Sequence, residues 1–151
     1  MHDSFALESF LPFRLNRLAS EVSERMAAIY AEKFGLDIPQ WRVLATLSGG
    51  ADITAQNIVA STRTHKSTIS RAVQELEARG LVERAVSTAD RRANALRLTA
   101  AGRKLFARMQ PLVLAYQEAL LAALEPAESK ALLRGLQALE RTLALTTGEG
   151  A

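Results

Sequence analysis

Basic side chains gather in the middle of this 151-residue chain. Residues 63–108 hold eleven Lys or Arg against four Asp or Glu, a net charge of +7, whereas the rest holds eight against twelve, a net charge of −4. Concentrated positive charge between acidic flanks is typical of a surface that binds a polyanion such as nucleic acid. A solvated charged surface would have the same totals, so the local pattern has to decide between these two interpretations.

Several kinds of chemistry are excluded by the composition. The chain has no cysteine and two histidines, His2 and His65. Disulfides, thiolate metal sites and cysteine nucleophiles are therefore ruled out, and one internal histidine is too few for a typical metal site. We also find no glycine-rich phosphate loop and no paired catalytic carboxylates. We expect neither an enzyme nor a bound metal or cofactor.

Apolar residues make up 48% of the chain, which is enough to bury the core of one domain. No apolar run approaches the roughly 18 residues that cross a bilayer. Residues 1–15 lack the basic start and apolar block of a secretory signal. The sequence therefore predicts a cytoplasmic protein that does not associate with membranes.

A helix predicted over residues 65–79 has one apolar stripe, formed by Ile69, Ala72, Val73 and Leu76. At 100° per residue, the rest of its first half is small, polar and cationic. The candidate DNA-contacting residues on this helix are Lys66, Ser67, Thr68, Ser70, Arg71 and Gln74. Such a face suits the DNA major groove, because small side chains allow close approach and Arg can bind guanine. The alternative is an ordinary amphipathic surface helix.

The elements around this helix favour the DNA interpretation. A shorter helix, over 55–61 and capped by Thr54, precedes it across the polar turn 62–64. Two short helices joined by a tight turn form a helix-turn-helix. After Gly80 the apolar period changes to two, which predicts strands over 81–86 and 95–98.

The loop between these two strands, residues 87–94, is polar and contains Asp90, Arg91 and Arg92. Arginines on a protruding loop suit the narrow minor groove or the phosphates of DNA. We expect Arg91 or Arg92 to make such a contact, with solubility as the alternative role. We expect Asp90 to stabilise the wing by pairing with a neighbouring Arg.

Long helices are predicted on both sides of this central unit. An apolar stripe runs through residues 4–34, where Pro12 suggests that the regular helix begins close to that residue. A short helix begins at Pro39, a long one is capped by Thr99, and the last begins at Pro126. The last helix has a leucine stripe and the N-terminal segment is rich in Phe, so both need a partner. We predict a homodimer, with a monomeric bundle as the alternative.

Three runs resemble the MarR family of bacterial transcriptional regulators: "IPQWRVLATL" at 38–47, "THKSTISRAVQELEARGLVER" at 64–84 and "DRRANALRLTAAG" at 90–102. The pattern Asp-x-Arg followed by Leu-x-Leu-Thr-x-x-Gly is matched by Asp90, Arg92, Leu96, Leu98, Thr99 and Gly102. The resemblance implies a mainly α fold, with a winged helix-turn-helix over 38–98 that has a two-stranded β wing. It also implies dimerisation helices over 1–37 and 99–151, the whole forming one continuous compact unit.

The resemblance further implies a function. Family members are homodimers that bind a palindromic operator in double-stranded DNA and repress nearby genes until a small aromatic or phenolic ligand binds. By this resemblance, Ser67, Thr68, Ser70 and Arg71 belong to the recognition helix, and Arg92 is the wing arginine. The alternative is a winged helix that binds protein or acts as a non-specific architectural DNA-binding module.

The family's ligand site lies between the dimer helices and the winged helix. In this chain such a crevice would be lined by Phe13, Arg14, Arg17 and Trp41. Arginine beside aromatic rings suits an aromatic carboxylate or a similar anion. The alternative is that Trp41 belongs to the core and that Arg14 or Arg17 pairs with an acid at the dimer interface.

Overall fold

The computed structural model describes residues 4–85 and 95–145, and these residues are mostly helical. The helices are η1 (Leu7–Ser9), α1 (Leu11–Phe34), α2 (Ile38–Leu47), α3 (Ala55–Thr62), α4 (Lys66–Ala78), α5 (Ala100–Ala122) and α6 (Pro126–Thr142). Three short strands complete the described part: β1 (Ile53–Thr54), β2 (Val82–Arg84) and β3 (Ala95–Leu98). The prediction of a mainly α fold with a winged helix-turn-helix is confirmed.

Side-chain caps begin three of the predicted helices where the sequence indicates them. The Thr54 hydroxyl accepts a hydrogen bond from the backbone N–H of Asn57 at the start of α3. The His65 ring accepts from the N–H of Ser67 at the start of α4, and Thr99 accepts from that of Gly102 at the start of α5. Such caps satisfy N–H groups that have no partner within the helix.

The N-terminal helix begins at Leu11, with Pro12 in its first turn. The regular helix thus starts close to Pro12, as that residue suggests, and not at residue 4. It ends at Phe34 and is followed by the C-cap Gly35, which adopts the left-handed conformation with φ of 63°. A side chain at this position would be strained, so glycine is favoured there.

Among the described residues the sheet has three strands: β2 and β3 form the predicted two-stranded wing, and β1 adds a third strand that the sequence did not predict. The central strand is β3, which pairs antiparallel with β2 on one side and with β1 on the other. Ile53 lies opposite Leu96, and Thr54 lies opposite Ala95. A strand of two residues is too short to show the alternation from which strands are predicted. The predicted loop residues Asp90, Arg91 and Arg92 lie outside the described residues.

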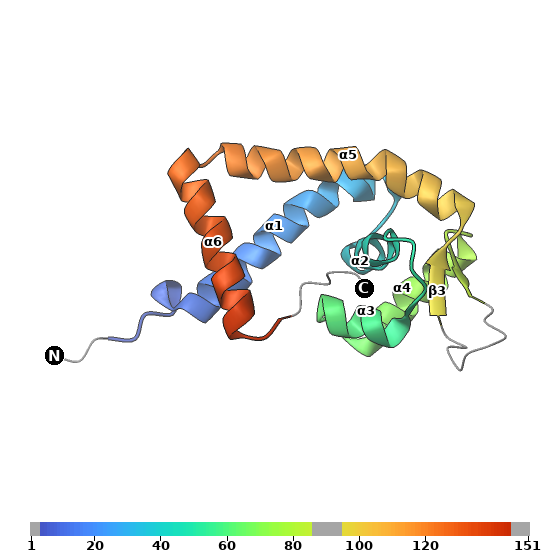
Figure 1. The fold of residues 1–151 in the computed structure, drawn as a ribbon, viewed down its shortest axis with the longest axis horizontal. Helices are drawn as coiled ribbons and strands as arrows, with labels where there is room; N and C mark the ends of the chain where they lie inside the picture. The colour runs from blue at the N-terminus through green and yellow to red at the C-terminus, as the bar shows by residue number, and fades with distance from the viewer. Residues whose placement is uncertain (1–3, 86–94, 146–151) are drawn as a thin grey trace.

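The hydrophobic core joins the winged helix to the two long helices. It contains buried side chains from α2, α3, α4 and the sheet, together with Tyr30 of α1 and Met109 and Val113 of α5. Burying each large apolar side chain stabilises the fold by about 1.5–3 kcal/mol. In Figure 1, α2, α3, α4 and β3 gather beneath one end of α5, while α6 and the start of α1 lie towards its other end. The C-terminal half of α1 and the first half of α5 therefore hold the winged helix in place.

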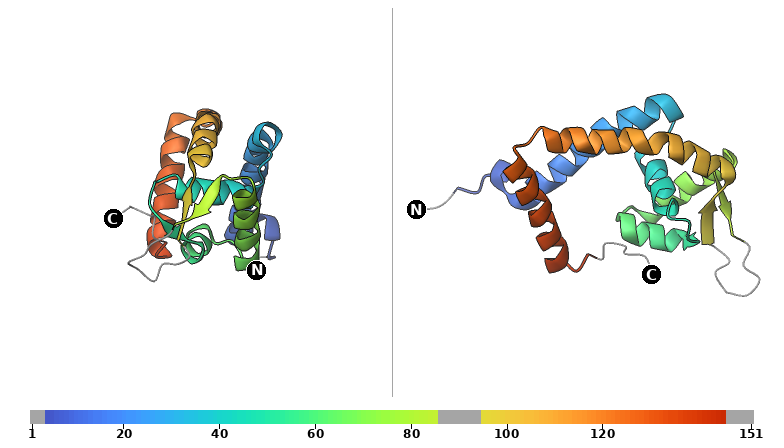
Figure 2. Two further views of the ribbon diagram at one scale, coloured as in Figure 1. Left: turned by 90° about the vertical axis from the view of Figure 1, so that its right-hand side faces the viewer. Right: turned by 45° about the horizontal axis from the view of Figure 1, so that its top comes forward.

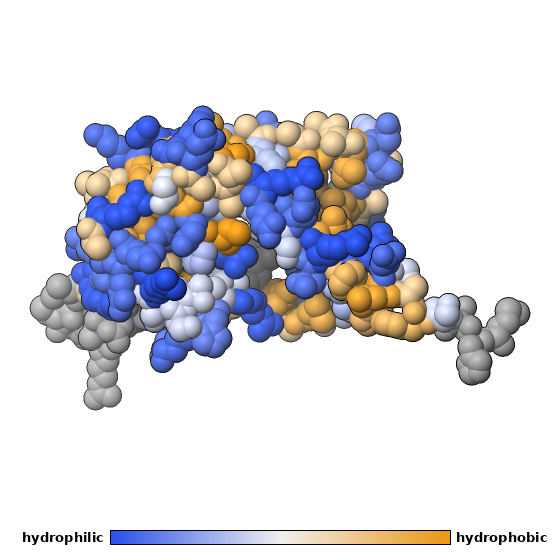
Figure 3. All heavy atoms as spheres, turned by 180° about the vertical axis from the view of Figure 1, so that it is seen from behind, coloured by the Kyte–Doolittle hydropathy of each residue, from blue (hydrophilic) through white to orange (hydrophobic). Residues whose placement is uncertain are grey.

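Large apolar side chains remain exposed at the end of the molecule away from the winged helix. No residue of α6 is buried, and the two further views in Figure 2 show this helix projecting from the end of α5. The exposed residues there are Leu132, Leu133, Leu136, Leu139, Leu143 and Leu145, with Phe5, Leu7, Phe10, Leu11, Leu15 and Leu18 at the N-terminal end. Figure 3 shows apolar surface gathered where η1 and the start of α1 lie. Within residues 4–85 and 95–145, no helix has the length and apolarity needed to span a membrane.

Candidate nucleic-acid interface

One face of α4 is buried and the opposite face is exposed. Ile69, Ala72, Val73 and Leu76 are at most 3% exposed and form part of the core. The candidate contact residues Lys66, Ser67, Ser70, Arg71 and Gln74 are exposed, and Thr68 is half-buried. The predicted orientation of this helix is therefore confirmed. Contact of these residues with DNA stays a prediction.

The turn before α4 is held by the preceding helices. Arg63 adopts the left-handed conformation at the end of α3, with φ of 53°. A guanidinium nitrogen of Arg42 on α2 donates to the hydroxyl of Thr64 at 3.1 Å. The ring of His65 then caps α4 and lies 2.8 Å from the Ser67 hydroxyl. The first turn of α4 is thus fixed relative to α2 and α3, and this turn contains the small polar residues.

Arg71 lies beside Glu75, which in turn contacts Gln40, and the sequence singled out neither of these two partners. The Nε atom of Arg71 is 3.5 Å from Oε1 of Glu75, and Oε2 of Glu75 accepts a hydrogen bond from Nε2 of Gln40 at 2.7 Å. An open hollow of about 420 Å³ adjoins this group and is lined by Asp37, Pro39, Ser67, Thr68, Arg71, Ala72 and Glu75. The exposed face of α4 therefore contains acidic as well as basic groups.

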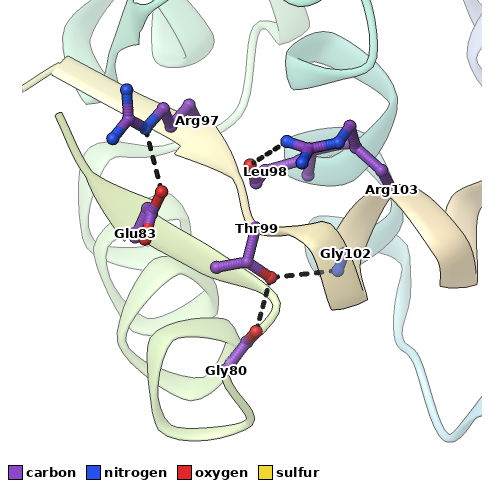
Figure 4. A network of polar contacts seen from close by, with 7 residues as sticks. All are labelled: Gly80, Glu83, Arg97, Leu98, Thr99, Gly102 and Arg103. Atoms are coloured by element: carbon purple, nitrogen blue, oxygen red, sulfur yellow. Dashed lines mark hydrogen bonds and ion pairs between the residues drawn. The ribbon is translucent and has the colours of Figure 1, made fainter.

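The base of the wing is held by a network of polar contacts (Figure 4). Arg97 on β3 donates to Glu83 on β2 at 2.9 Å, and Arg103 donates to the backbone carbonyl of Leu98 at 3.0 Å. The Thr99 hydroxyl donates to the carbonyl oxygen of Gly80 at 2.6 Å and accepts from the N–H of Gly102. These contacts fix the strands to the end of α4 and to the start of α5.

Gly102 lies where the first turn of α5 touches the backbone of Leu81. A Cβ atom on residue 102 would overlap the carbonyl oxygen of Leu81 and would lie 3.0 Å from its carbonyl carbon. A side chain here would push the strand and the helix apart. The spacing Thr99-x-x-Gly102 thus combines a helix cap with a close backbone approach.

The four candidate ligand-binding residues lie in two separate groups. Trp41 stacks between Tyr30 and Phe106, at ring-centroid distances of 5.5 and 5.8 Å. Near the other end of α1, the Arg17 guanidinium lies 5.6 Å from the centre of the Phe13 ring. Phe13 precedes Tyr30 by 17 residues, which is about 25 Å along a helix. Arg14 follows Phe13 in the chain and is exposed, so it belongs with Phe13 and Arg17 and not with Trp41.

Tyr30, the ring at one end of the Trp41 stack, is a buried phenol. The Tyr30 hydroxyl has no hydrogen-bond partner among the described residues. Burial raises the pKa of Tyr30 to about 12, an effect that the positive charge of Arg42 partly opposes. Loss of solvent disfavours the charged phenolate, so Tyr30 stays neutral up to strongly alkaline pH.

Comparison with known proteins gives three kinds of match. A sequence model of the MarR family matches residues 34–93. The chain is 32% identical over 108 residues to the HTH-type transcriptional repressor IacR of Pseudomonas putida. This alignment covers 72% of the chain and 64% of the repressor, so somewhat less than two thirds of the relative's length is matched.

Solved structures share the fold over nearly the whole chain. A MarR/EmrR family transcriptional regulator from Acinetobacter sp. ADP1 matches with a TM-score of 0.82 and 25% identity, covering 94% of this chain and all of that one. The Mycobacterium tuberculosis MarR family protein Rv2887, in complex with salicylic acid, matches with a TM-score of 0.71 and 24% identity, covering 92% and 99% of the two chains. Sequence and fold agree, and the chain is similar over nearly its whole length to transcriptional regulators of the MarR family.

Proposed function

We propose that this protein is a homodimeric, sequence-specific DNA-binding repressor whose affinity for its operator changes when a small aromatic ligand binds. The observation that supports DNA binding most strongly is the exposed face of α4. It presents Ser67, Ser70, Arg71 and Gln74 to solvent from a helix whose opposite face is fixed in the core. The repressor role is supported by the Pseudomonas putida relative, which is named as a repressor.

The geometry favours different roles for different residues. Arg71 lies one to two turns into α4 and is suited to a bidentate contact with guanine in the major groove. Lys66 and Ser67 lie in the first turn, where polar and basic side chains suit phosphate oxygens. Arg91 and Arg92 are assigned to the minor groove or to phosphates on the basis of the sequence.

Dimerisation is supported by the exposed leucines of α6 and the exposed apolar residues of η1 and α1. Large exposed apolar side chains gathered at one end of a molecule are typical of an interface. In a two-fold dimer the segments 1–37 and 99–151 form the interface, and residues 38–98 of each subunit face the DNA. Two α4 helices about 34 Å apart would then enter successive major grooves of a palindromic operator.

A small aromatic acid or phenol is the ligand class that we propose. Arg17 lies over the ring of Phe13, and Arg14 is exposed beside it. A guanidinium next to an aromatic ring suits a ligand that has both a carboxylate and a ring. Rv2887, which has the same fold, was solved with salicylic acid, so this fold accommodates such a molecule.

Selection of bound fragments from genomic DNA, followed by competition with random duplex, tests the proposed function. We expect a palindromic site that is preferred by about 10³-fold or more over random DNA. Arg71→Ala is expected to weaken binding to this site by about 1–3 kcal/mol. The matched control Arg25→Ala, which removes an exposed arginine of α1 that pairs with Glu21, is expected to leave it unchanged. Equal binding to all duplexes would contradict the proposal and favour an architectural module, and absence of duplex binding would favour a protein-binding winged helix.

A further inference from the structure

Three side chains connect the interior of the protein to the exposed face of α4. Gln40 on α2 is buried, at 7% exposure. Its Oε1 atom accepts a hydrogen bond from the backbone N–H of Asp37 at 3.0 Å, and its Nε2 atom donates to Oε2 of Glu75 at 2.7 Å. Both ends of the amide are used, so its orientation is determined by its partners.

The second carboxylate oxygen of Glu75 faces Arg71. The distance from Oε1 of Glu75 to Nε of Arg71 is 3.5 Å. The side chain of Arg71 is 81% exposed, and an exposed pair of this kind contributes little to stability. The order Arg before Glu is also the less favourable one along a helix. The small stabilisation from the Arg71–Glu75 pair therefore does not explain why the buried amide of Gln40 holds Glu75 in place.

An effect on DNA recognition would give this arrangement a role. An arginine free to adopt many rotamers loses conformational entropy when it is ordered against a base, and prior ordering reduces that loss. A fixed carboxylate also repels a phosphate placed close to Arg71, which weakens the complexes with random DNA in which Arg71 would contact the backbone and not a base. Both effects increase the difference in affinity between the correct site and random DNA.

Building on the DNA-binding role proposed above, we propose that Glu75, held by Gln40, is a positioning residue for specificity. It orients the Arg71 guanidinium towards one base of the operator and disfavours its use as a general phosphate contact. Gln40 acts through Glu75, and neither residue needs to touch the base itself.

The test compares Glu75→Gln and Gln40→Met with the matched control Glu77→Gln. Glu77 lies on the same helix but pairs with Arg84, at 3.1 Å. The operator selected by the wild-type protein is compared with single-base variants and with random duplex at one salt concentration. For Glu75→Gln we expect about tenfold weaker discrimination at the base read by Arg71, together with tighter binding to random duplex. Gln40→Met should lose discrimination without this tightening, and Glu77→Gln should keep the discrimination.

A double-mutant cycle separates positioning from a merely structural role. In the Arg71→Ala background, Glu75→Gln should cause no further loss of discrimination at that base. The inference would be overturned if Glu75→Gln alone left the base discrimination unchanged. It would also be overturned if Glu75→Gln reduced the discrimination as much in the Arg71→Ala background as in the wild-type protein. Thermal unfolding of each variant shows whether the fold is retained.

An NMR measurement on the DNA-free protein shows whether the positioning role of Glu75 is wrong or whether the proposed DNA-binding function is wrong. The Nε–H signal of Arg71 should move on Glu75→Gln and stay in place on Glu77→Gln. If the signal moves but the wild-type protein prefers no DNA sequence, the proposed function is wrong and the inference fails with it. If the wild-type protein prefers a sequence but the signal does not move, only the inference is wrong.

Discussion

Replacing Gly102 with alanine tests the junction between the wing and α5. The added methyl group would overlap the carbonyl oxygen of Leu81, which is backbone and not the flexible end of a side chain. The same carbonyl accepts a hydrogen bond from the N–H of Thr99 at 3.1 Å. Relieving the overlap therefore requires the strand to shift and this hydrogen bond to lengthen.

The expected magnitude combines three terms. Gly→Ala inside a helix normally stabilises by about 1 kcal/mol. Inserting a methyl group into a packed site costs about 1–3 kcal/mol, and weakening the Thr99 hydrogen bond costs about 1 kcal/mol more. Gly102→Ala should therefore lower the free energy of unfolding by about 1–3 kcal/mol, the opposite of the effect of the same substitution in an open helix.

Gly135→Ala in α6 is the matched control, because no described residue outside the neighbouring backbone of α6 has an atom within 4 Å of a Cβ at this position. We expect it to raise the free energy of unfolding by about 0.5–1 kcal/mol. The assay is urea unfolding followed by circular dichroism at one fixed protein concentration, since the stability of a dimer depends on concentration. If Gly102→Ala were as stable as the wild-type protein, or if both variants shifted equally, the proposed close approach would be refuted.

Three further perturbations test other parts of the molecule. Leu136→Asp places a charge on the exposed stripe of α6 and should convert the proposed dimer to monomers in analytical ultracentrifugation; a variant that sediments as a dimer would contradict the proposed interface. The unfolded chain releases the Tyr30 proton near pH 10 and the folded one near pH 12, so the wild-type protein should lose stability as the pH rises through this range. Tyr30→Phe should lose less stability than the wild-type protein over the same pH range, and in urea titrations at pH 7 it should be equally or slightly more stable. Equal losses of stability at alkaline pH would argue against the buried phenol. Arg92→Ala should weaken operator binding and reduce the slope of log K against log salt by about one; an unchanged slope would exclude a phosphate contact.

Much of the fold could be predicted because local signals agree with one another. The apolar stripe of α4 repeats with the helical period, and Thr54, His65 and Thr99 cap the helices that follow them. These signals depend only on neighbours along the chain, so the structure reproduces them. The third strand was missed because β1 has two residues, and its pairing with β3 joins segments about 40 residues apart.

The group around Arg71 shows where sequence reasoning reaches its limit. Gln40 and Glu75 are 35 residues apart on different helices, and no local period relates them. The sequence does contain a local signal for Gln40, because Asp37 and Gln40 have the spacing of a capping box. The sequence could not show that the candidate ligand residues lie in two separate groups, because an aromatic side chain such as Trp41 is equally typical of a core and of a pocket.

Cleavage of operator DNA from a reagent attached to α4 tests the central claim most directly. The chain has no cysteine, so Ser70→Cys provides a single attachment point for an iron chelate on the exposed face of α4, and Gln117→Cys provides a control on α5. We expect Ser70→Cys to cut the selected operator at two places about 10–10.5 base pairs apart, with no cutting from the control. Equal cutting from both positions, or no cutting from Ser70→Cys while the operator remains bound, would show that α4 does not lie in the groove.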